Sequence, residues 1–139
     1  MSTYLLDTNA CIALIKNAPG PIRDRFDREM HAGTRLAIPS VATFELWYGV
    51  AHSAKPQKNH AILSEFLSGP YTLLPFDDGD ARVAGVVRAE LEAIGKPIGP
   101  YDLLIAGQAL RHGLTLVTAN EREFARVRGL KWENWAARR

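Results

Sequence analysis

Three acidic residues of this 139-residue chain stand where apolar side chains are expected. Asp7 follows Leu5 and Leu6 and precedes the apolar residues Ile12, Leu14 and Ile15. At helical spacing, Glu45 falls in the apolar stripe of segment 41–51, and Asp102 falls in that of segment 100–113. An ionised carboxylate in such surroundings costs free energy unless something neutralises or binds it. The three acids are therefore candidates for a shared chemical role.

Carboxylates that converge on one point repel one another and raise one another's pKa. A hard divalent cation removes that conflict, because Mg²⁺ and Mn²⁺ prefer oxygen ligands. One cysteine and four scattered histidines do not indicate a zinc site. For any single acid, a helix cap or a buried partner for an arginine is the simpler interpretation, and Asp102 suits a helix N-terminus. Three such acids together favour the cation.

A cation held by carboxylates can polarise a phosphoryl oxygen and activate a water for in-line attack. The chain has no GxxxxGK[ST] loop and no GxGxxG after a predicted strand, so neither of these nucleotide-binding devices is present. Hydrolysis of a phosphodiester needs only acids, a metal and a groove for the backbone. Placement and residue type therefore indicate phosphodiester hydrolysis.

The elements that position these acids alternate along the chain. Strands are predicted at 3–6, 35–39, 71–76 and 114–119. Helices are predicted at 8–17, 19–33, 41–51, 58–69, 77–95, 100–113 and 121–127, and a small terminal segment follows at 129–135. Ser40 is the predicted N-cap of the helix at 41–51. This order predicts an α/β fold, a parallel β-sheet flanked by helices. Sites in such folds lie at the carboxyl ends of the strands, where Asp7, Asn120 and Glu123 follow directly.

Length and composition set the outer bounds. A length of 139 residues with 47% hydrophobic content fits one domain, residues 1–139. The apolar runs are too short to span a membrane and no signal peptide is evident, which favours a cytoplasmic protein. The net charge of +2 is weakly basic, and Lys and Arg cluster in 22–28, 122–131 and 138–139. These clusters are either phosphate contacts or solvated helix faces.

Four stretches carry a resemblance to a known family. They are LLDTN, FELWYG, IGPYDLLIAGQAL and LVTANEREFARVRGLKWENW. In this order, over essentially the whole chain, they resemble the PIN-domain family and, more narrowly, VapC toxins of bacterial toxin–antitoxin pairs. Asp7, Glu45 and Asp102 match the family's first, second and third metal acids. The fourth acidic position departs from the family pattern, because Asn120, Glu121 and Glu123 stand where many PIN domains carry an aspartate.

The resemblance implies a Mg²⁺-dependent endoribonuclease, with Mn²⁺ as a possible substitute and tRNA as a frequent target, whose cleavage inhibits translation. It also implies a cognate VapB-type antitoxin that blocks the site, and a toxin homodimer that assembles with the antitoxin into a larger complex. In this interpretation Asn120 and Glu123 complete the site around the metal ligands, while Thr8 and Thr118 hydrogen-bond to carboxylates.

Two other classes stay open at this point. One is a phosphoacceptor signalling module, in which a lone aspartate takes a phosphoryl group beside Mg²⁺. The other is a non-catalytic RNA- or protein-binding adaptor that keeps the PIN fold. The aromatic side chains of Trp47 and Tyr48, beside Glu45, either anchor a partner or pack in the core. Incubation of the pure chain with RNA, in Mg²⁺ or in EDTA, distinguishes the three classes.

Overall fold

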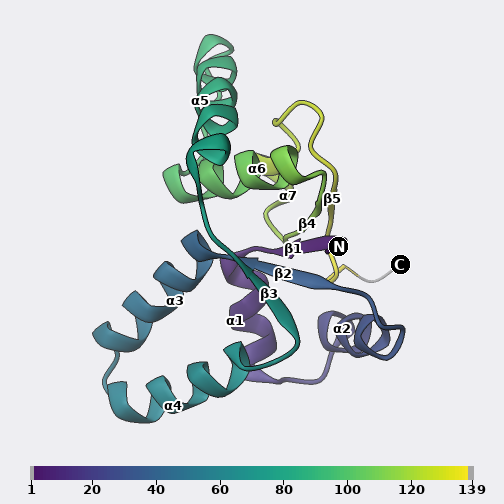
Figure 1. The fold of residues 1–139 in the computed structure, drawn as a ribbon, viewed down its shortest axis with the longest axis vertical. Helices are drawn as coiled ribbons and strands as arrows, with labels where there is room; N and C mark the ends of the chain where they lie inside the picture. The colour runs from purple at the N-terminus through teal and green to yellow at the C-terminus, as the bar shows by residue number, and fades with distance from the viewer. Residues whose placement is uncertain (1, 138–139) are drawn as a thin grey trace.

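The computed structural model describes residues 2–137 as helices around a sheet of five short strands (Figure 1). The strands are β1 Tyr4–Leu6, β2 Leu36–Pro39, β3 Tyr71–Leu74, β4 Thr115–Val117 and β5 Trp132–Glu133. The helices are α1 Thr8–Lys16, α2 Pro21–His31, α3 Ser40–His52, α4 Pro56–Leu67, α5 Asp78–Ala93, α6 Pro100–His112 and α7 Glu121–Phe124. Arg138 and Arg139, the last of the basic clusters, lie outside the described residues.

The sheet is parallel throughout, as the alternating pattern predicts. Its order is β3-β2-β1-β4-β5, so β1 lies at the centre between β2 and β4. In this register Leu5 is the partner of both Ala37 and Leu116. Four strands are predicted from the sequence, and the structure adds β5 within the terminal segment 129–135. Because all strands run the same way, their carboxyl ends meet along one edge.

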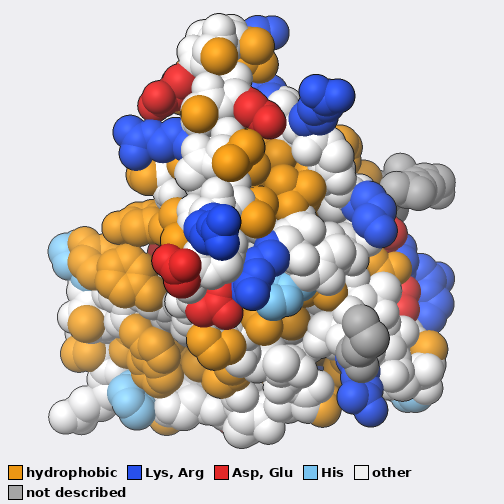
Figure 2. All heavy atoms as spheres, turned by 45° about the horizontal axis from the view of Figure 1, so that its top comes forward, with side chains coloured by type: hydrophobic (Ala, Val, Ile, Leu, Met, Phe, Trp, Pro, Cys, Tyr) orange, Lys and Arg blue, Asp and Glu red, His pale blue; other side chains and the backbone are white. Residues whose placement is uncertain are grey.

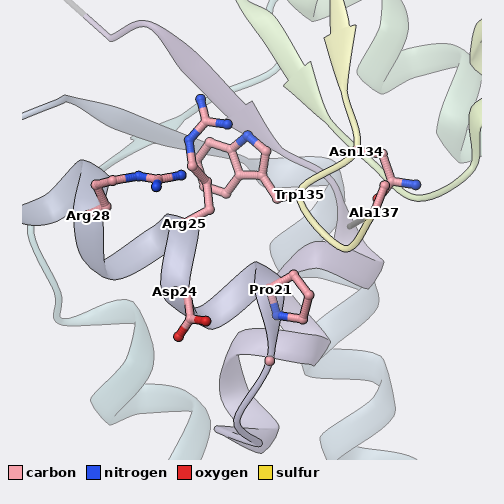
Figure 3. A pocket seen from close by; sticks show the side chains of 8 residues that line it. Pro21, Asp24, Arg25, Arg28, Asn134, Trp135 and Ala137 are labelled. Atoms are coloured by element: carbon pink, nitrogen blue, oxygen red, sulfur yellow. The ribbon is translucent and has the colours of Figure 1, made fainter. Parts of the chain in front are cut away.

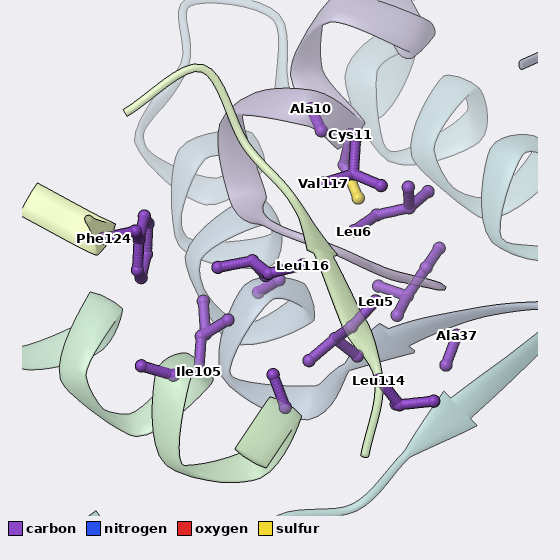
Figure 4. Packing of buried hydrophobic residues seen from close by; sticks show 14 of the residues in the cluster. Leu5, Leu6, Ala10, Cys11, Ala37, Ile105, Leu114, Leu116, Val117 and Phe124 are labelled. Atoms are coloured by element: carbon purple, nitrogen blue, oxygen red, sulfur yellow. The ribbon is translucent and has the colours of Figure 1, made fainter. Parts of the chain in front are cut away.

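Helices cover both faces of this sheet. In Figure 1, α5, α6 and α7 lie above the strands, and α1, α2 and α4 lie below them. The core fills the space between the layers, and Leu5, Leu6, Leu116, Ile105 and Phe124 are all fully buried (Figure 4). Burial of such side chains contributes about 1.5–3 kcal/mol each to folding. This packing holds α6 against the sheet and so sets where Asp102 lies.

The helix ends follow ordinary capping chemistry, with one correction. Helix α6 begins with Pro100 in its first turn and ends at Gly113, whose φ of 64° suits a residue without a Cβ. Ser40 is not the N-cap of α3, because the helix already includes it and Pro39 takes the cap position. The Ser40 hydroxyl instead accepts a hydrogen bond from the Phe76 backbone N–H at 3.0 Å. Within residues 2–137, no helix is both long enough and apolar enough to cross a membrane.

Candidate active site

Asp7 occupies the single position between the end of β1 and the start of α1. Its side chain is 3% exposed and accepts a hydrogen bond from the Ala10 backbone N–H at 2.8 Å, so it is the N-cap of α1. Burial raises the pKa of Asp7, and the charge of Glu45 raises it further, against hydrogen bonds from Thr118 and Ala10. Asp7 is therefore both the N-cap of α1 and a neighbour of another acid, Glu45.

Glu45 reaches the same region from α3. Its carboxylate accepts a hydrogen bond from the Thr8 hydroxyl at 2.6 Å, although the two residues are 37 positions apart. The predicted hydrogen bond from Thr8 to a carboxylate is thereby confirmed. The contact ties the first turn of α1 to α3 and restrains the Glu45 carboxylate near Asp7.

Asp102 is supplied by the first turn of α6 and is half-buried. Burial is the largest cause that raises its pKa to about 6, followed by the charges of Asp7, Glu123 and Glu45. The side-chain amide of Asn120 opposes this by donating a hydrogen bond to the Asp102 carboxylate at 3.3 Å. The charges of the other three acids, which come from separate elements, therefore act on the pKa of Asp102.

The segment after β4 supplies the remaining side chains of the candidate site, Asn120 and Glu123. The Asn120 amide nitrogen donates to both Asp102 and Glu123, and so links α6 to α7. The backbone N–H of Asn120 donates to the Thr118 hydroxyl at 2.9 Å. Glu121 is exposed on α7. In this fold, Asn120 and Glu123 thus occupy the place where the family resemblance leaves the fourth acid open.

The chemistry of these donors fits a hard divalent cation. Carboxylate oxygens predominate, and the charges of the neighbouring acids add to the burial that raises the pKa of Asp102. Within the described residues, no group of three or more Asp, Glu, His or Cys side chains is so arranged that it could hold a metal ion as the side chains stand. The four acids are coupled through space and through the Asn120 amide rather than gathered around one point.

We expect millimolar Mn²⁺ or Mg²⁺ to raise the melting temperature of the chain by several degrees. A ligand that binds only the folded state at 10–100 times its Kd stabilises it by roughly 1.4–2.7 kcal/mol. Asp102→Asn is expected to remove most of this response, while Asp24→Asn, a change at an exposed acid of α2, is expected to keep it. Thermal melts with and without EDTA measure the effect. A parent chain indifferent to Mn²⁺ would contradict the shared cation site.

The raised pKa of Asp102 also predicts a pH dependence in the absence of metal. A carboxyl whose pKa is higher in the folded state stabilises the fold below its unfolded pKa, and this stability is lost as pH rises through about 6. Asp102→Asn should therefore be more stable than the parent at pH 7, by about 1–2 kcal/mol after its partial exposure is allowed for. The difference should shrink as the pH falls towards 4. Urea unfolding in EDTA at several pH values measures it, and a constant difference would contradict the raised pKa of Asp102.

Arg25, in the basic cluster of segment 22–28, is paired with acids of the fold. The Arg25 guanidinium bonds Glu29 at 2.7 Å and Glu133 at 3.0 Å, and it lies 5.0 Å from the ring centre of Trp135. Arg25 and Trp135 line a cavity of about 550 Å³ between α2 and the C-terminal segment, together with Asp24, Arg28 and Asn134 (Figure 3). None of the site acids lines this cavity. Through its contacts, Arg25 anchors the C-terminal segment to α2.

Two aromatic side chains beside the acids are not singled out by the sequence-based interpretation. Phe44 is 54% exposed and Tyr101 is 44% exposed, and each directly precedes a site acid in the chain. The sequence offers only a weak signal for them, an aromatic residue next to an acid, because this pattern also occurs as FD at 26–27 and 76–77. Of the two aromatics that were singled out, Tyr48 is exposed and Trp47 packs against the core.

Comparison with known proteins assigns the chain to a family. The PIN domain model matches residues 4–130. A Shigella flexneri protein named tRNA(fMet)-specific endonuclease VapC is 43% identical over 98% of this chain and 100% of its own length. The structure also superposes on one chain from each of two DNA-bound VapBC complexes. The chain from Salmonella typhimurium has a TM-score of 0.89 at 43% identity, covering 97% of this chain and 99% of that one. The chain from the VapBC2 complex of Rickettsia felis has a TM-score of 0.88 at 37% identity, covering 96% of this chain and 98% of that one. The chain therefore belongs to the PIN domain family, within its group of VapC ribonucleases.

Proposed function

We propose that this chain is a Mg²⁺-dependent endoribonuclease that cleaves tRNA and is the toxin of a VapBC-type toxin–antitoxin pair. The observation that carries the proposal is the approach of Asp7, Glu45 and Asp102, from three elements, at the carboxyl edge of the sheet. The names of the relatives support RNA, and tRNA in particular, as the substrate. The VapBC complexes among the similar structures support a cognate VapB-type antitoxin.

The proposed mechanism assigns a task to each side chain. Asp7, Asp102 and Glu45 hold the cation, for which Mn²⁺ can substitute, since PIN-domain nucleases in general use divalent metal ions. A cation held by these side chains would supply Lewis-acid polarisation of the scissile phosphoryl group and a lowered pKa for the attacking water. Asp7 is held rigidly by its cap to α1, and Thr8 restrains Glu45.

The segment after β4 restrains the last of these ligands. Asn120 keeps Asp102 and Glu123 close together through its amide nitrogen. Because this bridge acts on a carboxylate that three other acids repel, it opposes an outward turn of Asp102 in the absence of substrate. Asn120 and Glu123 thereby prepare the site for the cation.

The remaining features of the proposal concern assembly. We propose that residues 1–139 act as one PIN-like nuclease domain and form a homodimer that joins the antitoxin in a larger complex. Its tRNA substrate implies action in the cytoplasm, where cleavage of tRNA inhibits translation.

Incubation of the purified chain with total RNA tests the function directly. We expect tRNA to be cut in Mg²⁺ and left intact in EDTA, with cleavage positions mapped by sequencing the fragment ends. RNA that is bound but never cut in Mg²⁺ or Mn²⁺ would indicate the adaptor instead. Transfer of a phosphoryl group to Asp7 from a small phosphodonor, with no cleavage, would indicate the phosphoacceptor module.

A further inference from the structure

The candidate active site is bordered by an aromatic pair whose members come from different helices. The rings of Phe44 on α3 and Tyr101 on α6 meet edge to face, with their centres 5.6 Å apart and an interplanar angle of 61°. Both side chains are exposed, at 54% and 44%. Figure 2 shows hydrophobic side chains gathered on the side of the molecule where α3 lies in Figure 1. The pair therefore spans the two helices that supply Glu45 and Asp102.

The same two helices offer almost no positive charge to a nucleic acid. Helix α3 contains no Lys or Arg, and the single Arg of α6, Arg111, lies near its far end. Arg111 is also paired with Asp77 and Asp80. The acids of the site repel phosphates until a cation is bound. Any binding of RNA by these two helices must therefore use contacts that do not depend on positively charged side chains.

Stacking of bases on aromatic rings is such a contact, and proteins use it to bind single-stranded RNA. An edge-to-face pair leaves a ring face available to a further flat group. Because the ring pair bridges the two helices that carry Glu45 and Asp102, a base stacked on it lies beside a phosphodiester bound at the acids. We infer that Phe44 and Tyr101 form a stacking platform for an unpaired base beside the scissile phosphate. The inference rests on the proposed function, which it extends to substrate positioning.

Binding without cleavage provides the first test. The Asp7→Asn chain is titrated with a short single-stranded RNA of mixed sequence in which 2-aminopurine replaces adenine, because stacking quenches the fluorescence of this base. We expect quenching in the Asp7→Asn chain. Adding Phe44→Leu or Tyr101→Leu should remove most of it and weaken the apparent Kd about 10-fold or more. Tyr101→Phe, which keeps the ring, should restore both.

Tyr48 offers a matched control on the same helix. It is 62% exposed, but its ring stacks on His52 at 5.5 Å rather than on Tyr101. Tyr48→Leu should therefore leave quenching and affinity unchanged. Equal losses of quenching and affinity in Tyr48→Leu and Phe44→Leu would mean that exposed aromatic rings bind RNA wherever they lie on the surface. This result would overturn the platform.

Activity provides the second test, in chains that keep Asp7. Phe44→Leu should lower kcat/KM for RNA cleavage about 10-fold or more and leave the Mn²⁺-induced rise in melting temperature unchanged, since no acid is altered. Leucine variants that cleave and quench like the parent would overturn the platform and leave the proposed nuclease function intact. Quenching lost in the leucine variants of a chain that never cleaves RNA would support the platform and refute the nuclease.

A protein contact is the competing use of the pair. Light scattering of the free chain and co-purification with an antitoxin expressed alongside it measure this use. If Phe44→Leu and Tyr101→Leu change the mass of the free chain or release the antitoxin while RNA quenching stays intact, the pair is a protein interface and the stacking platform is wrong.

Discussion

Asp7→Asn is expected to lower kcat/KM for RNA cleavage by about 10²–10³-fold or more, because it removes a buried negative charge that the cation needs. The fold should survive the change. Asparagine is as good an N-cap as aspartate, so the hydrogen bond from the Ala10 N–H is retained. Cleavage of a labelled tRNA measures the activity, and circular dichroism with a thermal melt checks the fold.

Asp24→Asn is the matched control for Asp7→Asn, since it removes one negative charge at an exposed position of α2. It should leave cleavage unchanged. Because metal-free Asp7 pays a desolvation cost for its charge, Asp7→Asn should melt no lower than the parent in EDTA. Undiminished cleavage by a well-folded Asp7→Asn chain would remove this residue from the cation site.

Gly107→Val is expected to destabilise the chain by about 3 kcal/mol or more, which is a large fraction of the roughly 5–15 kcal/mol that stabilises a typical domain. Gly107 is buried in α6, and a Cβ placed there would lie 2.7 Å from both the Cα and the Cβ of Ala84 on α5. The obstacle includes backbone atoms, so the two helices would have to separate. Since α6 supplies Asp102, the damage should reach the site. Urea unfolding measures the loss of stability.

Gly85 provides the comparison on the neighbouring helix. A Cβ at this position meets no atom within 4 Å, and the residue is exposed on α5. Gly85→Ala should therefore stabilise the chain by about 0.5–1 kcal/mol through helix propensity alone. A Gly107→Val chain as stable as the parent would show that α5 and α6 are not packed as closely as described.

The main frame of the fold could be predicted because its strands are short apolar runs separated by helices of ordinary length. The strand β5 could not, since its two residues, Trp132 and Glu133, form a strand only through pairing with β4. The role of Ser40 was also beyond reach. Its hydroxyl binds the N–H of Phe76, which is 36 residues away, and local capping preference carries no information about such a partner.

The positions of the acids could be predicted from polarity alone, because a carboxylate in an apolar stripe indicates a polar partner or a bound cation. Their mutual coupling could not, because it depends on how α3, α6 and α7 pack around Asp7. The bridge from Asn120 to Asp102 and Glu123 is of this kind. Phe44 and Tyr101 were passed over for a related reason: an aromatic residue on a helix of an α/β fold is usually core, and exposure is a property of the packed structure.

The strand order has a consequence for the chain as it is being synthesised. Asp7 leaves the ribosome early, yet its strand is bordered by β4, and the amide that bridges Asp102 and Glu123 belongs to Asn120, which follows much later in the chain. A nascent chain that has emerged only as far as α5 has neither β4 nor Asp102, and so holds two of the four acids. The acids of the site therefore come together only after α6, β4 and α7 have left the ribosome.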